Sequence, residues 1–243
     1  MSRLVWISGA SRGIGRALVE SVPWPEARVI GVSRTDKDLP DLTDHLALDL
    51  ADPQAWAALG ESFERELAGF DGDRVVFAHC AGTIDPVGFA GEVDRDAYRD
   101  NVVLNSASPQ VLGQLFLGAA AGAASARRHL VMITSGAAKS VYPGWSSYGA
   151  AKAAVDQWVR NAGAEQDLRG GVEVLAIAPG TVDTDMQARI RATPAEEFPQ
   201  RQKFLDLHQA GKLTPAAEVA AKMWRLLDAG LDNGSVVDLR NLS

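Results

Sequence analysis

Short apolar runs alternate with helix-length segments along the whole chain, and this alternation restricts the possible folds more than any other feature. The helical patterns occupy residues 13–22, 53–68, 94–124, 146–167 and 215–229. Most of the apolar runs are apolar on both faces, as are strands buried in a parallel sheet. The alternation predicts an α/β fold, a doubly wound parallel sheet with helices on both faces. The expected strands, about seven in number, are residues 4–8, 28–33, 45–49, 74–79, 129–135, 172–178 and 235–239.

One segment interrupts this pattern. No repeat, low-complexity tract or linker divides the chain, so a single domain over residues 1–243 is expected. The segment at about residues 184–213 departs from the alternation, because it is richer in charge and contains Pro194 and Pro199. Such an excursion is a candidate substrate loop. It is expected to be either a mobile lid or a pair of fixed surface helices.

Charge and cysteine content exclude several classes of protein. The chain carries a formal net charge of −7, which argues against general nucleic-acid binding. The single cysteine, Cys80, excludes an internal disulfide and a thiolate metal cluster, and no metal site is expected. No uncharged apolar run reaches the roughly 18 residues of a membrane span, and the first residues lack the apolar core of a secretory signal. A cytoplasmic protein without a membrane partner is expected.

A glycine-rich turn follows the first predicted strand. The sequence GASRGIG places Gly9, Gly13 and Gly15 between this strand and a helix. Backbone N–H groups and the helix dipole at such a turn favour an anion such as a pyrophosphate, and the glycines allow its close approach. An ordinary strand-to-helix turn is the alternative. The position in the first unit of an alternating chain favours dinucleotide binding.

Two arginines indicate which dinucleotide the glycine-rich turn is expected to bind. Enzymes that bind NAD carry an acid roughly 20 residues after the glycines. This chain has Arg34 there, with no acid between Gly31 and Thr35, and Arg12 lies inside the glycine turn. Two guanidinium groups can hold a 2′-phosphate, so the cofactor is predicted to be NADP(H) rather than NAD(H). Alternatively, both arginines are solvated surface residues.

A tyrosine and a lysine share one face of the predicted helix at residues 146–167. Tyr148 and Lys152 are four positions apart. The ammonium is expected to favour the phenolate, which would lower the pKa of Tyr148 and suit it to acid–base work. Ser135, at the end of the preceding strand, is expected to donate to the same substrate oxygen. Alone, the pair would more often be a half-buried tyrosine near a surface lysine.

These motifs together resemble those of the short-chain dehydrogenase/reductase family over nearly the whole chain. The resemblance implies a Rossmann-like fold and an NADPH-dependent carbonyl reductase that transfers a hydride to a ketone, with Tyr148 as the acid–base. It also implies a homodimer or homotetramer. Asn105 matches the family residue that supports a proton-relay water with Lys152, and Lys152 is also expected to bond the ribose.

Further cofactor contacts follow from the same resemblance. Asp49 and Leu50 match the adenine contacts, and Val182 and Thr184 match the residues at the nicotinamide carboxamide. The expected cofactor contacts are Gly9, Ser11, Arg12, Gly13, Ile14, Gly15, Arg34, Asp49, Leu50, Ala81, Gly82, Tyr148, Lys152, Pro179, Gly180, Val182 and Thr184. The expected catalytic residues are Asn105, Ser135, Tyr148 and Lys152, and the expected substrate contacts are Ser135, Trp145 and Tyr148.

The chain departs from the family pattern at His79 and Cys80, where two asparagines are usual. This change is expected to affect stability more than chemistry, and Cys80 is interpreted as a core residue. A narrower resemblance links the chain to sepiapterin reductases and to bacterial relatives that reduce diketones such as benzil. Asn241 stands where sepiapterin reductases carry the acid that anchors the pterin, so an aromatic ketone or diketone fits better. Trp145 is either a wall of an apolar pocket or core packing.

Two other classes of protein are less well supported. A hydrolase would need a nucleophile elbow, and no G-x-S-x-G occurs. Phosphoryl transfer would need a P-loop, and no G-x-x-x-x-G-K-[ST] occurs. A catalytically idle sensor that binds NADP(H) would typically lose the tyrosine or the lysine, and this chain keeps both.

Overall fold

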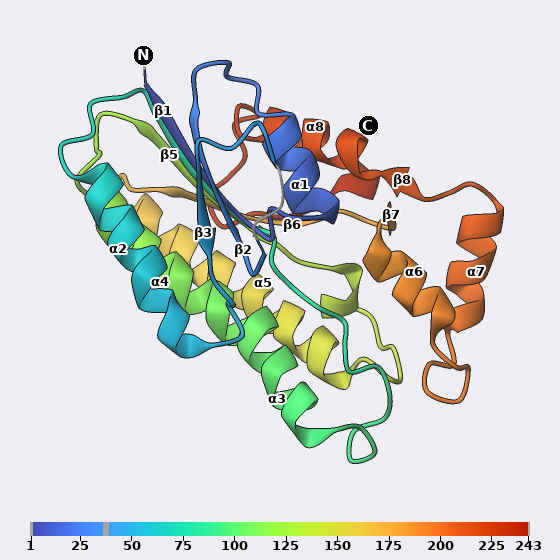
Figure 1. Cartoon of the computed structure of the whole chain (residues 1–243). Coiled ribbons are helices and arrows are strands. Elements are labelled where there is room, and N and C mark those ends of the chain that lie inside the picture. Colours follow the sequence, from blue (N-terminus) through green and yellow to red (C-terminus); the bar gives the residue numbers. More distant parts are fainter. Residues whose placement is uncertain (1, 36–38, 243) are drawn as a thin grey trace.

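A seven-stranded parallel sheet forms the centre of the molecule. The computed structural model describes residues 2–35 and 39–242 (Figure 1). The strand order is β3-β2-β1-β4-β5-β6-β9, and all six neighbouring pairs are parallel. The predicted doubly wound α/β fold is confirmed. The strands are β1 (Arg3–Ser8), β2 (Arg28–Ser33), β3 (Asp44–Ala47), β4 (Arg74–His79), β5 (Arg127–Ile133), β6 (Glu173–Ala178) and β9 (Val236–Asp238).

Helices cover both faces of the sheet. Helices α1 (Gly13–Glu20) and α8 (Ala216–Leu226) pack together on one face (Figure 1). Helices α2 (Trp56–Leu67), α4 (Ser108–Ala120) and α5 (Ser146–Asp167) cover the other. No helix in the described part of the chain is long and apolar enough to cross a membrane.

Strand β1 shows why the core has two halves. Successive side chains point to opposite faces of a sheet. Leu4 and Trp6 therefore join the cluster under α2, α4 and α5, whereas Val5 and Ile7 join the cluster under α1 and α8. The Trp6 ring meets the Phe63 ring edge-on at 5.1 Å between centroids, and its indole N–H donates to Ser62 Oγ at 3.2 Å. Burial of these apolar faces fixes the sheet between its two helical layers.

The long helical pattern at residues 94–124 is confirmed as a continuous helical run over residues 95–120, but this run is not a regular α-helix throughout. The structure has α3 (Arg95–Val102), a π-helical turn (Val103–Ala107) and then α4. Pro109 in the first turn of α4 explains the break, because proline has no N–H to donate to the carbonyl oxygen of Asn105, four residues earlier. The main-chain oxygen of Asn105 therefore lacks its α-helical donor. Such π-turns occur frequently at functional sites.

The segment at residues 184–213 contains two short helices, α6 (Asp185–Ala192) and α7 (Arg201–Gln209). They lie to one side of the main helical layers (Figure 1). A two-stranded sheet of β7 (Val182–Asp183) and β8 (Thr214–Pro215) joins the two ends of the segment. Ile190, Phe198 and Phe204 are buried in a third apolar cluster together with Trp145 and Tyr148. The segment thereby packs against the start of α5.

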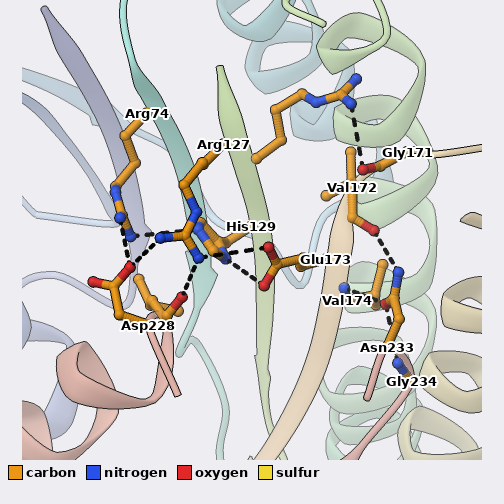
Figure 2. A network of polar contacts seen from close by, with 12 residues as sticks. Arg74, Arg127, His129, Gly171, Val172, Glu173, Val174, Asp228, Asn233 and Gly234 are labelled. Atoms are coloured by element: carbon orange, nitrogen blue, oxygen red, sulfur yellow. Dashed lines mark hydrogen bonds and ion pairs between the residues drawn. The ribbon is translucent and has the colours of Figure 1, made fainter. Parts of the chain in front are cut away.

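A network of polar contacts lies at the amino-terminal ends of the strands (Figure 2). Asp228, just after α8, accepts from Arg74 Nη2 at 2.7 Å and also pairs with Arg127. Glu173 lies 3.7 Å from Arg127 Nη2 and 3.4 Å from His129 Nδ1. His129 is fully buried. The network joins β4, β5 and β6 to the segment after α8. The expected cofactor and catalytic residues lie at the opposite, carboxyl-terminal ends of the strands.

Candidate active site

The expected site residues lie at the carboxyl ends of the parallel strands. From β1 the chain continues to β2 and β3 on one side, and it then returns to β4 on the other side. This reversal makes the junction of β1 and β4 a topological switch point, where open α/β sheets bind ligands. The glycine turn after β1 and the segment after β4 both lie there.

The three glycines of the turn are needed for different reasons. Gly9 has φ +68°, and a Cβ on it would lie 2.9 Å from Ala81 N. A Cβ on Gly15 would lie 2.3 Å from the main-chain oxygen of Gly9. Gly13 has φ +56° but more space, since the nearest atom to a Cβ there is Thr184 Cγ2 at 3.4 Å. The turn therefore packs directly against the end of β4 and faces the expected nicotinamide segment.

Ser8 links the turn to the end of β4. Its Oγ accepts hydrogen bonds from the backbone N–H groups of Cys80 and Ala81, both at 3.1 Å. Ser8 is fully buried. Sequence reasoning missed this residue, although a serine that ends a strand before a glycine turn is a usable signal.

Arg12 and Arg34 are both exposed, and neither forms an ion pair with a described residue. Arg12 immediately precedes α1. Arg34 directly follows β2, the strand next to β1. Two uncommitted guanidinium groups beside an open glycine turn suit an anionic dinucleotide with an additional phosphate. The residues present therefore fit NADP(H).

Tyr148 and Lys152 are both buried on α5, with exposed fractions of 7% and 5%. Lys152 Nζ lies 5.8 Å from the centre of the Tyr148 ring. It donates to the main-chain oxygen of Ile133, the last residue of β5, at 2.9 Å. A buried ammonium needs such a partner. Burial nevertheless lowers the pKa of Lys152 to about 8, although Cys80 and Asp156 oppose the change.

The expected lowering of the Tyr148 pKa is wrong in direction. Burial raises the pKa of the phenol, and only the Ser135 hydroxyl opposes this. The expectation based on the spacing of Tyr148 and Lys152 considers only the charge of the ammonium. Loss of water around the buried phenol has the larger effect on its pKa. The phenol is therefore protonated at neutral pH, the state in which it can donate a proton.

Ser135 lies beyond the strand rather than at its end. Strand β5 stops at Ile133, and Ser135 precedes the short 3₁₀ helix Gly136–Ala138. Its Oγ accepts from the backbone N–H of Ala137 at 3.2 Å. A hydroxyl has one proton to donate and two acceptor positions, so this contact leaves the Ser135 proton available, and the Tyr148 phenol is its hydrogen-bonding neighbour. Ser135 and Tyr148 thus present two O–H groups together.

Asn105 is buried behind these residues. Its side chain binds both backbone groups of Thr83: Nδ2 donates to the oxygen at 2.7 Å, and Oδ1 accepts from the N–H at 3.2 Å. A Cβ on Gly82 would lie 2.8 Å from Asn105 Oδ1 and 3.8 Å from Lys152 Nζ. The π-turn, the end of β4 and α5 therefore meet at one point.

The remaining expected contacts lie in the glycine turn or in the segments that follow β3, β4 and β6. Asp49 is exposed, and its Oδ1 accepts from Ala51 N at 3.0 Å, whereas Leu50 is buried. Thr184 begins α6 and faces Gly13. Val182 is buried in β7. Ser11 and Ile14 are half-buried in the glycine turn, Ala81 and Gly82 follow β4, and Pro179 and Gly180 follow β6.

His79 and Cys80 take structural positions. His79 is buried, and its Nε2 lies 3.1 Å from Ser108 Oγ at the start of α4. Burial and then Lys152 lower the pKa of His79 to about 3, so the ring is neutral. Cys80 packs against the cluster under α1 and α8, and burial raises its pKa to about 12. This is the reverse of what a nucleophilic thiolate requires.

Trp145 belongs to the aromatic cluster beside the two hydroxyl groups. Its ring stacks on Phe198 at 4.5 Å and meets the Tyr148 ring edge-on at 5.6 Å. It is 6% exposed. A groove of about 560 Å³ contacts Trp145 and Tyr142, but neither Ser135 nor Tyr148 lines it. Trp145 is therefore both core packing and a wall of this groove.

The site also contains an arginine that sequence reasoning missed. Arg240, near the C-terminus, lies against Gly136 and Gly180. Only the tertiary structure brings it there, and no sequence motif marks it.

Comparisons with known proteins agree with this geometry. The family model for short chain dehydrogenases matches residues 3–195. Benzil reductase ((S)-benzoin forming) of Bacillus subtilis (strain 168) is 34% identical over 240 residues, which cover 96% of this chain and 97% of that protein. Sepiapterin reductase of Xenopus laevis is 29% identical, covering 94% of this chain and 91% of that protein.

A solved structure extends the likeness to a protein with a bound cofactor. A Beutenbergia cavernae protein, described as an NAD(P)-dependent gluconate 5-dehydrogenase, has a TM-score of 0.79 and 26% identity to this chain. The match covers 97% of this chain and 94% of that one, and that structure holds NADP at low occupancy. Together with the family match, these findings confirm the resemblance inferred from the motifs. The chain belongs to the short-chain dehydrogenase family and is an oxidoreductase that acts on carbonyl or alcohol groups.

Proposed function

We propose that this protein is an NADPH-dependent carbonyl reductase for ketones or diketones, including aromatic, benzil-like ones. The observation that carries the proposal is the pair of hydroxyl groups of Tyr148 and Ser135. The phenol is kept protonated by burial, and the serine hydroxyl keeps its proton available while it accepts from Ala137 N. Two such donors suit a carbonyl oxygen that gains negative charge during reduction.

Each residue of the site has a part in this reaction. A reduced nicotinamide, when bound at the glycine turn, would supply the hydride that the carbonyl carbon accepts. Tyr148 donates its proton to the carbonyl oxygen, which gives an alcohol, and Ser135 stabilises that oxygen by hydrogen bonding. Lys152 would bind the ribose and, with a water held near the main-chain oxygen of Asn105, would return a proton to Tyr148. The distance of 5.8 Å between Lys152 Nζ and the centre of the Tyr148 ring supports this relay.

NADPH is proposed over NADH because Arg12 and Arg34 are exposed and free of ion pairs with described residues. An acid that would bond the ribose hydroxyls is missing between Gly31 and Thr35. The NADP held by the structurally similar Beutenbergia cavernae protein supports this choice.

The names of two relatives suggest two substrates. Both the benzil reductase and the sepiapterin reductase match this chain over more than nine-tenths of its length. We favour a diketone, because Asn241 replaces the acid expected of a pterin site and because the rings of Tyr142 and Trp145 line the groove at the start of α5.

The test is a carbonyl panel followed by NADPH absorbance, with benzil, sepiapterin and a simple aryl ketone. We expect benzil to be reduced fastest and NADPH to be used better than NADH. Binding of NADPH without oxidation by any of these carbonyls would instead indicate a sensor. Equal use of NADH would contradict the assignment of the cofactor.

Assembly and location are also proposals. The small-residue stretches at residues 118–126 and 146–164 would let two copies pack closely as a homodimer or homotetramer. Light scattering after gel filtration would decide this. The cytoplasmic location remains a prediction.

A further inference from the structure

The Arg240 side chain crosses two glycines beside the candidate active site. A Cβ on Gly180 would lie 3.1 Å from Arg240 Cγ and 3.2 Å from its Cδ. A Cβ on Gly136 would lie 3.3 Å from Arg240 Nη2. A larger side chain at either position would crowd the arginine. These two glycines, from the segments after β5 and β6, therefore leave the space that Arg240 occupies.

Asp238 holds this arginine in place. It precedes the short 3₁₀ helix Leu239–Asn241, and its Oδ1 accepts from the backbone N–H of Arg240 at 3.0 Å. The same carboxylate accepts from Arg240 Nε at 2.9 Å and from Nη2 at 2.5 Å. Because Asp238 fixes both the backbone and the side chain, the guanidinium loses little freedom when it binds a ligand.

Part of the guanidinium remains available. The hydrogen bonds to Asp238 use Nε and Nη2, whereas Nη1 has no hydrogen-bond partner among the described residues. The Arg240 side chain is 59% exposed. Gly136, which its Nη2 approaches, directly follows Ser135. A donor is thus present one residue away from the proposed oxyanion donor.

We infer that Arg240 is a specificity-determining residue that binds the second oxygen of a 1,2-diketone. The inference rests on the proposed function, in which Ser135 and Tyr148 bind the oxygen that is reduced. In a 1,2-diketone the other oxygen is on the adjacent carbon, and the proposed binding mode directs this oxygen toward Arg240, whose Nη2 lies against Gly136, the residue after Ser135. No bond forms or breaks at this second oxygen, which only accepts hydrogen bonds from the guanidinium.

The net charge of the Arg240–Asp238 pair favours a neutral diketone over a keto acid as the substrate. Arg240 and Asp238 together carry no net charge, so a carboxylate would meet the Asp238 oxygens as well as the guanidinium. A ketone oxygen can accept from a charged donor without that repulsion. Hydrogen bonding at the second oxygen also withdraws electron density from the neighbouring carbonyl carbon, which favours hydride addition there.

Two substrates that differ by one oxygen test the inference. Benzil and deoxybenzoin share both phenyl rings and the reacting ketone, but deoxybenzoin lacks the second carbonyl. Arg240→Met keeps the aliphatic stem over Gly180 and removes the guanidinium. We expect its kcat/KM for benzil to fall about 10- to 100-fold, as for loss of a charged hydrogen bond. Its kcat/KM for deoxybenzoin should stay within about 3-fold of the wild-type value.

Two further variants complete the experiment. Lys212→Met removes an exposed cation outside the groove and should leave the benzil-to-deoxybenzoin ratio unchanged. Asp238→Asn keeps the arginine but loosens it, and should lower the ratio partway. NADPH binding and the thermal midpoint show whether each variant is folded. A ratio unchanged in Arg240→Met, or lowered equally by Lys212→Met, would overturn the inference. A wild-type enzyme that reduces neither ketone would contradict the proposed function itself.

Discussion

Lys152 Nζ donates to the main-chain oxygen of Ile133 at 2.9 Å, two residues before Ser135. This bond ties the lysine of α5 to the strand end that leads to the serine. The ammonium is therefore oriented by the main chain and not by the Tyr148 hydroxyl. A change at the tyrosine should leave the lysine in place, which makes the role of the phenol separately testable.

Tyr148→Phe removes the phenolic O–H and keeps the packing of the ring against Trp145. If Tyr148 is the proton donor, kcat with benzil should fall at least about 100-fold. NADPH affinity should stay near the wild-type value, because Lys152 keeps its own partner. Turnover numbers and a fluorescence titration with NADPH measure the two quantities. Near-normal turnover would refute the role of the phenol.

Ser135→Ala removes the second donor. Ser135 Oγ also accepts from Ala137 N, so some local stability will be lost with the hydroxyl. We expect kcat to fall by about 100- to 1,000-fold, as when one oxyanion donor is deleted. Thermal unfolding of the variant separates the loss of stability from the loss of rate. A folded Ser135→Ala enzyme with wild-type kcat would show that the carbonyl oxygen is bound elsewhere.

Most of the fold could be predicted from sequence because β1, β2, β4 and β6 are apolar on both faces. Such runs fit only a sheet covered on two sides. Helix boundaries were harder, since the break between α3 and α4 depends on the single residue Pro109. For residues 184–213 the sequence left two alternatives, a mobile lid or a pair of fixed surface helices, because prolines and charges make this segment resemble a loop.

Candidate residues of the site, whose roles stay predictions, were predictable where a motif carries them, as in the glycine turn and the Tyr148–Lys152 pair. The direction of the Tyr148 pKa was not, because it depends on burial, which spacing does not reveal. Arg240 could not be found either. Its approach to Gly136 joins residues about a hundred positions apart, and only the finished sheet brings them together.

Arg34→Asp tests the choice of cofactor. The substitution removes a cation expected to face the 2′-phosphate and adds a carboxylate that can bond ribose hydroxyls. NADPH affinity should fall by roughly 2 kcal/mol or more, and NADH affinity should hold or improve. Arg16→Asp is the matched control, because Arg16 is also exposed but pairs with Glu20 at 2.7 Å. An unchanged preference for NADPH would make Arg34 an ordinary surface residue.

The network of Figure 2 predicts how stability depends on pH. Arg74 Nη1 lies 3.4 Å from His129 Nε2 and can only donate, so the ring is neutral with its proton on Nδ1, toward Glu173. Burial, followed by Arg74 and Arg127, lowers the pKa of His129 to about 3, from 6.5. The unfolded chain binds more protons between these values. Stability is therefore complete above about pH 6.5 and is lost as the pH falls toward 3.

The free energy of unfolding should fall by about 2 kcal/mol between about pH 7 and pH 5 through His129 alone. His129→Gln should remove this part of the pH dependence. His208→Gln, a change at an exposed histidine, should keep the wild-type dependence. Urea unfolding at the two pH values gives the comparison. Equal pH dependence in His129→Gln and the wild type would show that the ring is already charged in the native protein.

The last prediction concerns α6 and α7, which follow the expected nicotinamide segment directly. They are held to the start of α5 by a small aromatic cluster, in which Phe198 stacks on Trp145 and Phe204 lies 5.5 Å from the same ring. Most of α7 outside Phe204 is solvent-exposed, whereas β6 is buried in the sheet. Few buried contacts mean that local opening costs less free energy.

We therefore expect amides at residues 187–207 to exchange faster than those of β6 in the free protein, and to gain protection when NADP⁺ and a ketone bind. Closure of this segment would exclude water from the reacting carbonyl. Hydrogen exchange of the free protein and of the complex measures both effects, and the last turn of α5, roughly 24 Å along the helix from Tyr148, serves as the internal control. Amides at residues 187–207 that are as protected in the free protein as those of β6 would identify α6 and α7 as fixed surface helices.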